Sequence, residues 1–487
     1  MVDSDPGSLS PRERRALTRV TSDRARIAVL AGTGLVVAFM QTVVTPILPH
    51  LPEYLSTTPA DASWVLTATL ASATVFTPIS GRLGDMYGKR RVLVGLLALV
   101  FAGNVIAGLT SELVPLIVAR ALQGAGLGAI PLGISIMRDV LHPRSLGGAV
   151  ALMSATLGVG GAVGLPVAAL IAQNFDWHLL FALGGLLVIV AGFFVVRVIP
   201  VSTLRSGGRF DAFGAFGLAV GLIGVLLAIS KGAEWGWASP VTLALGVGGL
   251  VVLVAWGGYE LRVSSPLVDL RVAVRRPVLL TNLASIAVGF SFFVVTASLP
   301  IVLETPPGVG GGFGLDLVTA SLCLMPLGLV MFLVSPLAAR LSAARGPRTS
   351  LLLGIAVIAV GFALAGVLLD EIWHVILVST TTGVGVGFAY AAMPNLIMRS
   401  VPPSETAAAN GLNAVMRTLG SSFSATLVGV ILASNVLIEG GIATPSRAAF
   451  SWVFVMGVVV ALVGFVLALF IPRRWRSEDT ASIPVQD

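Results

Sequence analysis

The chain has little of what enzymes and metalloproteins depend on. A single cysteine, Cys323, stands among 487 residues, which excludes an intramolecular disulfide framework and a cysteine-based metal site. The histidines are scattered, without the H-x-x-x-H spacing typical of a metal site: His50, His142, His178 and His374. Because no cluster of nucleophile, base or metal ligands can be assembled, we expect no enzyme, no metal and no resident cofactor.

Charge is also scarce. Charged residues make up 11% of the chain and hydrophobic residues 56%, against the ~25% of charged residues in globular proteins. This excludes a soluble globular protein and predicts a polytopic membrane protein surrounded by lipid. The formal net charge is +7, but the basic residues recur singly or in small groups between apolar stretches, so we expect no nucleic-acid partner. Arginine outnumbers lysine 28 to 2, which indicates a GC-rich bacterial source.

Long apolar stretches are what the chain has in abundance. A helix needs roughly 20 apolar residues to cross the hydrocarbon of a membrane. Divided at charges and at clusters of Pro and Gly, the sequence predicts fourteen spans: 27–49, 62–81, 91–110, 113–137, 146–172, 178–199, 212–231, 240–261, 277–303, 316–339, 349–369, 373–398, 407–436 and 449–471. We therefore expect an all-α membrane protein whose spans are grouped six, two and six.

The basic residues predict how the spans are oriented. Loops that an even number of spans would place inside hold 26 of the 30 Lys and Arg residues. Of the other four, Lys231 and Arg447 fall in outside loops, and Arg120 and Arg417 fall within spans. Since cytoplasmic loops are enriched in Lys and Arg, this bias predicts a multi-pass protein of the cell membrane with both termini in the cytoplasm. The first span is too long for the apolar part of a signal peptide, so we expect it to be retained.

A dense charged turn separates the second and third spans. Its sequence is Gly81-Arg82-Leu83-Gly84-Asp85-Met86-Tyr87-Gly88-Lys89-Arg90-Arg91. Glycines permit tight backbone geometry and close approach of helices, and an aspartate accepts hydrogen bonds at a helix N-terminus. We expect Asp85 to contact the N-terminus of the span that begins near Thr349 and the side chain of Arg138. The predicted gating residues are Gly81, Arg82, Asp85, Gly88, Lys89, Arg90 and, at the inner end of the fourth span, Arg138.

The same turn recurs in the second half of the chain. Residues 77–90 align without gaps on residues 335–348, an offset of 258, with Pro, Arg, Leu, Gly and Arg retained. The position of Asp85 is taken by Ala343 in the second copy. Parallel repeats of this kind produce two transporter halves around an axis normal to the membrane, with the substrate bound between them.

Three segments carry a resemblance to a known family. The pattern G-x-L-x-D-x-x-G-x-R from Gly81 to Arg90 resembles the loop 2-3 signature of the major facilitator superfamily, and Arg120-x-x-x-Gly124-x-Gly126 resembles its fourth-span pattern. Residues 410–420 are similar to the thirteenth span of fourteen-span drug:proton antiporters. The resemblance implies the major facilitator fold, with two pseudo-symmetric six-helix halves and a functional monomer. The implied parts are a cytoplasmic basic arm (1–26), an N-terminal half (27–199), two inserted helices with flanking loops (200–276), a C-terminal half (277–471) and a cytoplasmic tail (472–487).

The resemblance also implies a function. Members of this family export amphipathic small molecules by alternating access, in exchange for protons, with the proton gradient as energy source. The candidates for coupling are Asp85, Arg120 and Arg417; for both arginines the alternative is a side chain that extends to water at the end of its span. Spans that line the cavity in this family place these residues in the predicted pocket: Gln41, Thr45, Trp64, Arg120, Gln123, Met153, Phe290, Phe293, Met325, Tyr390 and Asn395. For the aromatic residues and the methionines, plain helix packing is the alternative.

The chain departs from the family pattern in two places. Gln41 stands where many drug:proton antiporters carry Asp, and the fifth-span exporter signature around Pro166 is only partly present. Without that Asp, no acidic residue lies deep inside a predicted span. Two alternatives therefore stay open: an exporter or uniporter specific for a lipid, metabolite or anion and not driven by protons, and a membrane sensor or scaffold that transports nothing.

Overall fold

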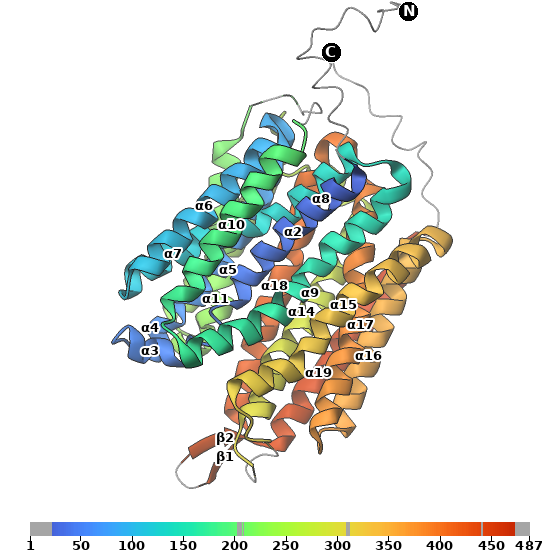
Figure 1. The fold of residues 1–487 in the computed structure, drawn as a ribbon. Helices are drawn as coiled ribbons and strands as arrows, with labels where there is room; N and C mark the ends of the chain where they lie inside the picture. The colour runs from blue at the N-terminus through green and yellow to red at the C-terminus, as the bar shows by residue number, and fades with distance from the viewer. Residues whose placement is uncertain (1–21, 202–206, 208, 308–311, 440–441, 473–487) are drawn as a thin grey trace, which may run out of the picture.

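The computed structural model describes residues 22–201, 207, 209–307, 312–439 and 442–472 (Figure 1). Within them, fourteen helical segments are long and apolar enough to cross a membrane, which confirms the predicted number. Their helices are α2 (Asp23–Thr42), α5 (Trp64–Tyr87), α6 (Lys89–Leu109), α7 (Leu113–Gly124) with α8 (Ala129–Val140), α9 (Pro143–Asn174), α10 (His178–Val198), α11 (Ala212–Trp235), α12 (Pro240–Glu260), α14 (Arg276–Glu304), α15 (Leu317–Arg345), α16 (Pro347–Val367), α17 (Ile372–Met398), α18 (Thr406–Ser434) and α19 (Arg447–Leu469). The predicted basic arm and tail lie almost entirely outside the described residues.

Short elements connect the long helices. They are α3 (Leu51–Tyr54), α4 (Pro59–Ala62), α13 (Leu270–Ala273), three 3-10 turns (Leu48–His50, Ala125–Gly128 and Pro403–Glu405) and the strands β1 (Val436–Glu439) and β2 (Ile442–Pro445). The two strands pair in antiparallel register, with Val436 opposite Pro445. The hairpin, α3 and α4 lie at one end of the molecule, which we call the hairpin end (Figure 1).

The opposite end holds the start of α2, the turns α5–α6 and α15–α16, and the ends of α10 and α19. We call it the gate end. At this end the start of α2 is bonded to the connection between α8 and α9: the Asp23 carboxylate accepts from the backbone N–H of His142 at 3.1 Å, and the Arg26 guanidinium donates to the carbonyl of Val140 at 2.8 Å. The first described helix, α2, therefore begins on the same side of the fold on which the last one, α19, ends.

Two separate apolar cores lie inside the two bundles. The first is built mainly from buried side chains of α2 to α10, and the second from those of α14 to α19. Between them, α9 packs along α15 and α5 packs along α18. The pair α11 and α12 packs together, and α11 also contacts α5 and α18. The two inserted helices are thus attached at a junction of the two bundles.

The first and fourth spans differ from simple helices. The prediction of one span over 27–49 is wrong at its end, because α2 stops at Thr42 and the prolines at 46 and 49 turn the chain into a 3-10 segment. The fourth span is divided into α7 and α8 by the 3-10 turn over its glycine run. A Cβ at Gly124 would lie 2.3 Å from the carbonyl oxygen of Thr69, so glycine is what allows this turn to approach α5.

The sequence repeat corresponds to a structural repeat. Helices α5 and α15 both end at a glycine with positive φ, +106° at Gly88 and +87° at Gly346. In the first copy, Arg90 donates to the carbonyl of Val196 near the end of α10 at 2.5 Å. In the second copy, Arg348 donates to the carbonyl of Leu469 at the end of α19, also at 2.5 Å. Each turn is therefore fastened to the last helix of its own bundle.

Candidate transport cavity and gate

A cavity of about 810 Å³ lies between the two bundles. Both contribute to its wall: α2, α5, α7, α8 and α9 from the first, and α14, α15, α17 and α18 from the second. It reaches the hairpin end, where Leu48, Ser63, Glu304 and Leu317 line it. The volume falls in the range of small-molecule sites.

Six of the predicted pocket residues line this cavity: Gln41, Thr45, Arg120, Phe293, Met325 and Tyr390. The structure places the other five elsewhere: Trp64, Gln123, Met153, Phe290 and Asn395. Whether any of these residues binds a substrate stays a prediction.

Packing explains why the large side chains among the five are not in the wall. Trp64 turns toward the inserted helix α11, where its ring lies 5.0 Å from the Lys231 ammonium and 6.3 Å from the ring of Trp235. Met153 is buried against glycines of α2 and α8, and Phe290 belongs to the core of the second bundle. For these three residues the helix-packing alternative describes the structure.

Each of the two polar residues among the five forms a hydrogen bond within the protein. Gln123 is buried beside the cavity and accepts from Arg120 at 2.6 Å, so it supports a wall residue without being one. Asn395 donates to the carbonyl of Ala391 one turn earlier in α17, at 2.8 Å. Both side chains act within the protein in this state.

Arg120 is the most deeply enclosed charge of the cavity wall. Its side chain is 0% exposed and donates to the carbonyl of Met40 at 3.1 Å as well as to Gln123. Its Nε and Nη2 atoms are buried without a hydrogen-bond partner. An arginine so placed does not extend to water, which disagrees with the snorkelling alternative.

Arg417 lies on α18 and is half-buried in the same wall. Its Nη1 donates to the Asn413 side chain at 2.8 Å, and its guanidinium carbon lies 5.1 Å from the centre of the Tyr390 ring. A cation over an aromatic face is an attractive arrangement. The aromatic ring and the amide hold the guanidinium at the cavity, away from the end of the span.

The inserted helix α11 also forms part of the wall, through Ser230, Ala233 and Glu234. The sequence analysis missed these residues, because the resemblance assigns the pocket to the two six-helix halves. A signal was present in Lys231, a lysine at the end of an otherwise apolar span in a chain that has only 2 lysines.

Bonds on two sides hold α11 in place. The Lys231 ammonium is 2% exposed and donates to Glu234 at 2.7 Å, to the Ser63 hydroxyl at 2.5 Å and to the carbonyl of Ala60 at 3.1 Å. On the other side, the Thr426 hydroxyl of α18 donates to the carbonyl of Ile229 at 2.7 Å. The helix is therefore bonded to the start of α5 and to α18.

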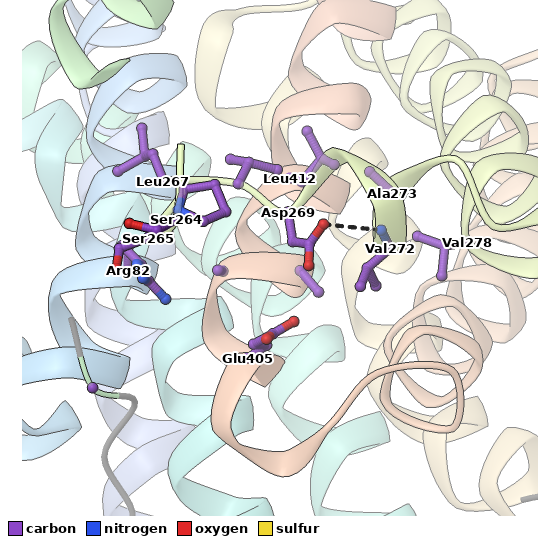
Figure 2. A pocket seen from close by; sticks show the side chains of 15 residues that line it. Arg82, Ser264, Ser265, Leu267, Asp269, Val272, Ala273, Val278, Glu405 and Leu412 are labelled. Carbon is purple, nitrogen blue, oxygen red and sulfur yellow. Dashed lines mark hydrogen bonds between the residues drawn. The ribbon is translucent and has the colours of Figure 1, made fainter. Parts of the chain in front are cut away.

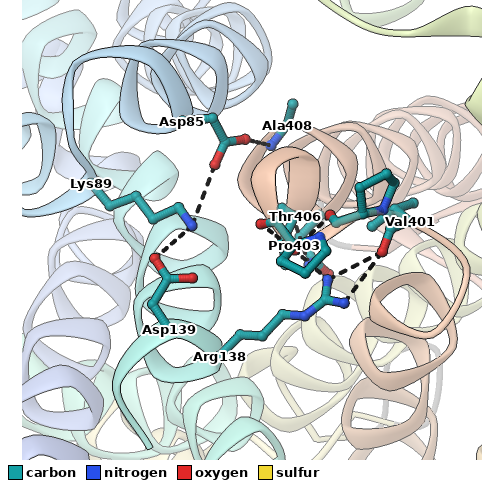
Figure 3. A network of polar contacts seen from close by, with 10 residues as sticks. Asp85, Lys89, Arg138, Asp139, Val401, Pro403, Thr406 and Ala408 are labelled. Atoms are coloured by element: carbon teal, nitrogen blue, oxygen red, sulfur yellow. Dashed lines mark hydrogen bonds and ion pairs between the residues drawn. The ribbon is translucent and has the colours of Figure 1, made fainter. Parts of the chain in front are cut away.

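At the gate end, polar bonds join the two bundles (Figure 3). Asp85, 1% exposed, accepts from the backbone N–H of Ala408 in the first turn of α18 at 3.1 Å. Arg138 of α8 donates to the carbonyl of Val401 at 3.3 and 3.4 Å and to the hydroxyl of Thr406. These bonds attach the N-terminus of α18 to the first bundle.

A buried lysine connects the acids behind this contact. The Lys89 ammonium is 2.7 Å from Asp139 and 3.6 Å from Asp85, and its side chain is fully buried (Figure 3). Asp139 was missed by the sequence analysis, although its position beside Arg138 in an apolar helix was a usable signal. The lysine holds the carboxylate that meets α18.

The predicted partners of Asp85 are wrong in detail. The structure pairs Asp85 with the N-terminus of α18, whereas α16, the helix that includes Thr349, packs on α17 and α19. The reason is the close approach of α5 and α18: a Cβ at Gly81 would lie 2.7 Å from the carbonyl oxygen of Ala407. Arg138 bonds to the same N-terminal region of α18 instead of to Asp85.

A smaller pocket of about 250 Å³ lies beside the gate (Figure 2). Arg82 and Glu405 face it, together with the segment 264–269 that follows α12. Glu260, at the end of α12, accepts from the backbone N–H of Val268 at 2.8 Å and fixes this segment. The connection that follows the inserted helices thus covers part of the gate end. In the part of the chain that the structure describes, no group of three or more His, Cys, Asp or Glu side chains is placed to hold a metal ion.

Comparison with known proteins decides the family. The sequence model of the Major Facilitator Superfamily matches residues 30–425. The chain belongs to the Major Facilitator Superfamily. Its fourteen spans are therefore those of a multi-pass membrane transporter.

Relatives within the Major Facilitator Superfamily include resistance and export proteins. The chain is 22% identical over 374 residues to multidrug resistance protein 3 of Bacillus subtilis, covering 76% of this chain and 72% of that protein. It is 24% identical over 462 residues to the lincomycin resistance protein LmrB of Listeria monocytogenes, covering 92% and 96%. It is 25% identical over 427 residues to the tetracenomycin C resistance and export protein of Streptomyces glaucescens, covering 84% and 76%.

A solved structure confirms the fold. The chain superposes on the human organic anion transporter MFSD10 with a TM-score of 0.67 and 15% sequence identity, covering 92% of this chain and 99% of that one. At this identity the likeness concerns the major facilitator fold alone.

Proposed function

We propose that the chain exports amphipathic small molecules across the cell membrane by alternating access, in exchange for protons. The observation that carries the proposal is the cavity, which reaches the hairpin end while polar bonds join the bundles at the gate end. A transporter of this type exposes its site to one side at a time. The names of the bacterial relatives, which include resistance to several antibiotics and export, support the same function.

The distribution of basic residues supports an orientation for this state. If the gate end faces the cytoplasm, as 26 of the 30 Lys and Arg residues favour, the cavity faces the outside. The protein then works as a monomer in a bacterial cell membrane, because one chain supplies both bundles and the whole cavity wall.

Asp85 is the group through which a proton would act on the gate. As a carboxylate it is attracted to the N-terminus of α18 and to Lys89, and protonation would remove both attractions. The bonds that hold α18 to the first bundle would weaken, and the gate end would open. Arg417 lies nine residues after Ala408 on the same helix, about 14 Å along its axis. Through α18, occupancy of the cavity and protonation at the gate would affect each other.

The test is a flux measurement with the purified protein in liposomes. We expect neutral lipophilic dyes to move faster when a pH gradient is imposed, and to lose that acceleration when an ionophore collapses the gradient. Liposomes without protein provide the control for passive leak. A flux that is identical with and without the gradient would contradict proton exchange.

A second candidate is an exporter or uniporter that is not driven by protons. It is favoured by Gln41, which lines the cavity where the resembling antiporters carry Asp, and by the position of Glu234 and Glu304, the acids that line the cavity, toward the hairpin end. Gradient-independent flux would support it. Binding of a dye with no flux under any condition would instead support a sensor or scaffold.

A further inference from the structure

The charges that line the cavity are unbalanced. Arg120 and Arg417 both line it, and among the described residues neither has a carboxylate within 4.0 Å. A guanidinium inside a membrane protein is costly, and it is ordinarily paired with an acid or with backbone carbonyls. The chain therefore keeps two positive charges at its central site without supplying the negative partner.

The acids of the cavity do not compensate for these arginines. Glu234 is bonded to Lys231 at 2.7 Å, and Glu304 is exposed at the end of α14. Both lie on the part of the wall nearest the hairpin end. A cationic molecule deep in the cavity would therefore meet positive charge without an adjacent carboxylate, whereas an anion would meet the complement of its own charge.

The two arginines have different access to a bound molecule. Arg120 is fully buried behind the cavity surface, so it acts through the electrostatic potential that it creates across a wall of low polarity. Arg417 is half-buried and gives one N–H to Asn413. Because a guanidinium has several N–H donors in a planar fork, the remaining donors can hold a carboxylate with two parallel hydrogen bonds.

The rest of the wall is largely apolar. Leu66 and Leu70 of α5 contribute to it, as do Phe292 and Phe293 of α14 and Met325 of α15. We infer that this cavity selects amphipathic anions, with the acidic group held at Arg417 and an apolar body against these side chains. The inference rests on the proposed function of the same cavity and narrows its substrates to a chemical class.

Three probes with one fluorophore test the inference. A dansyl group on the same alkyl chain is ended by a carboxylate, a methyl ester or an ammonium, and binding to the purified full chain is followed by fluorescence. We expect the carboxylate to bind about tenfold or more tightly than the ester, because hydrogen bonds to charged groups are the strong ones, and the ammonium to bind weakest. Equal affinities, or tightest binding of the ammonium, would overturn the inference.

Substitutions test which residue causes the preference for the carboxylate over the ester. We expect Arg417→Gln to remove the difference between carboxylate and ester while ester binding is kept, Arg417→Lys to retain part of it, and Arg120→Gln to reduce it. The matched control is Arg447→Gln, which removes an exposed arginine that pairs with Asp370 outside the cavity wall. A preference that survives Arg417→Gln would refute the role of Arg417.

A competition experiment tests the inference if the Arg417→Gln variant does not fold. The dansyl ester is displaced from the wild-type chain, and decanoate must compete better than decylamine.

The same competition experiment distinguishes two kinds of anion. Its outcome also tests the anion preference independently of the proposed export. Stronger competition by decanoate than by naphthoate indicates a fatty acid, and the reverse indicates an aromatic organic acid; failure of both refutes the inference. Binding does not require transport. Gradient-driven flux of the ester without preference for the carboxylate would therefore refute only the anion class, whereas preference without flux would refute only export.

Discussion

The turns α5–α6 and α15–α16 share a backbone feature but differ in their side-chain chemistry. Both end a helix at a glycine of positive φ, and both carry an arginine that donates to a carbonyl of the last helix in their own bundle. Only the first copy has the acid and the lysine, since the positions of Asp85 and Lys89 are taken by Ala343 and Pro347 in the second. The repeat thus preserves the arginine–carbonyl bond inside each bundle. The bond from Asp85 to α18, which joins the two bundles, belongs to the first copy.

The two aligned positions also differ in burial. Asp85 is buried against the first turn of α18, whereas Ala343 is exposed. A gate that depends on one acid can be switched by one proton, and the second turn then serves as a fixed counterpart. Substitutions at aligned positions can separate these two roles.

The largest effect is expected at the buried lysine. Lys89→Met removes the buried cation that lies beside Asp85 and Asp139, so we expect a loss of about 3–5 kcal/mol in the free energy of unfolding. The aligned change, Pro347→Met, replaces a residue at the first position of α16 and should cost less than about 1 kcal/mol. Unfolding of the purified variants in detergent measures both. Equal losses would mean that the lysine has no special part in the gate.

A smaller effect is expected when the acid alone is changed. Asp85→Asn keeps the shape but removes the charge that faces the N-terminus of α18, which should weaken the closed gate by about 1–2 kcal/mol. We expect the gradient-dependent flux in liposomes to fall roughly tenfold.

An acid introduced at the aligned position, Ala343, provides the control for that change. Ala343→Asp adds an exposed charge and should change stability by no more than about 0.5 kcal/mol, with flux unchanged. The exchanged pair, Asp85→Ala with Ala343→Asp, should remain as slow as Asp85→Ala. Recovery of flux in the exchanged pair would show that either turn can operate the gate.

The smallest effect is expected where the copies agree. Arg90→Gln and Arg348→Gln each remove a cation from a carbonyl at a helix C-terminus, so each should cost about 0.5–1 kcal/mol, and the two losses should add. Thermal unfolding of both single variants and the double variant measures this. A loss of flux confined to Arg90→Gln would disagree with equivalent scaffold bonds.

The number of spans and their sequence order could be predicted, because the length of an apolar run is a local property. The partner of Asp85 could not. The repeat suggested α16 by analogy, but the choice of α18 depends on how closely α5 approaches it at Gly81, which is a property of packing. The contribution of α11 to the cavity wall could not be predicted either, because the resemblance assigns the cavity to the two six-helix halves. Lys231 was the one residue of α11 whose type indicated a contact.

The wall formed by α11 has a consequence for the route by which a molecule leaves. Helix α11 is bonded to the start of α5 through Lys231 and to α18 through Thr426, and α12 packs against it. In the proposed orientation, a molecule in the cavity faces protein on that side instead of the acyl chains of the outer leaflet. If the protein exports its substrate as proposed, α11 and α12 would block lateral exit into lipid on that side. An apolar substrate would then be released into water, from which it can diffuse away before it partitions back into the membrane.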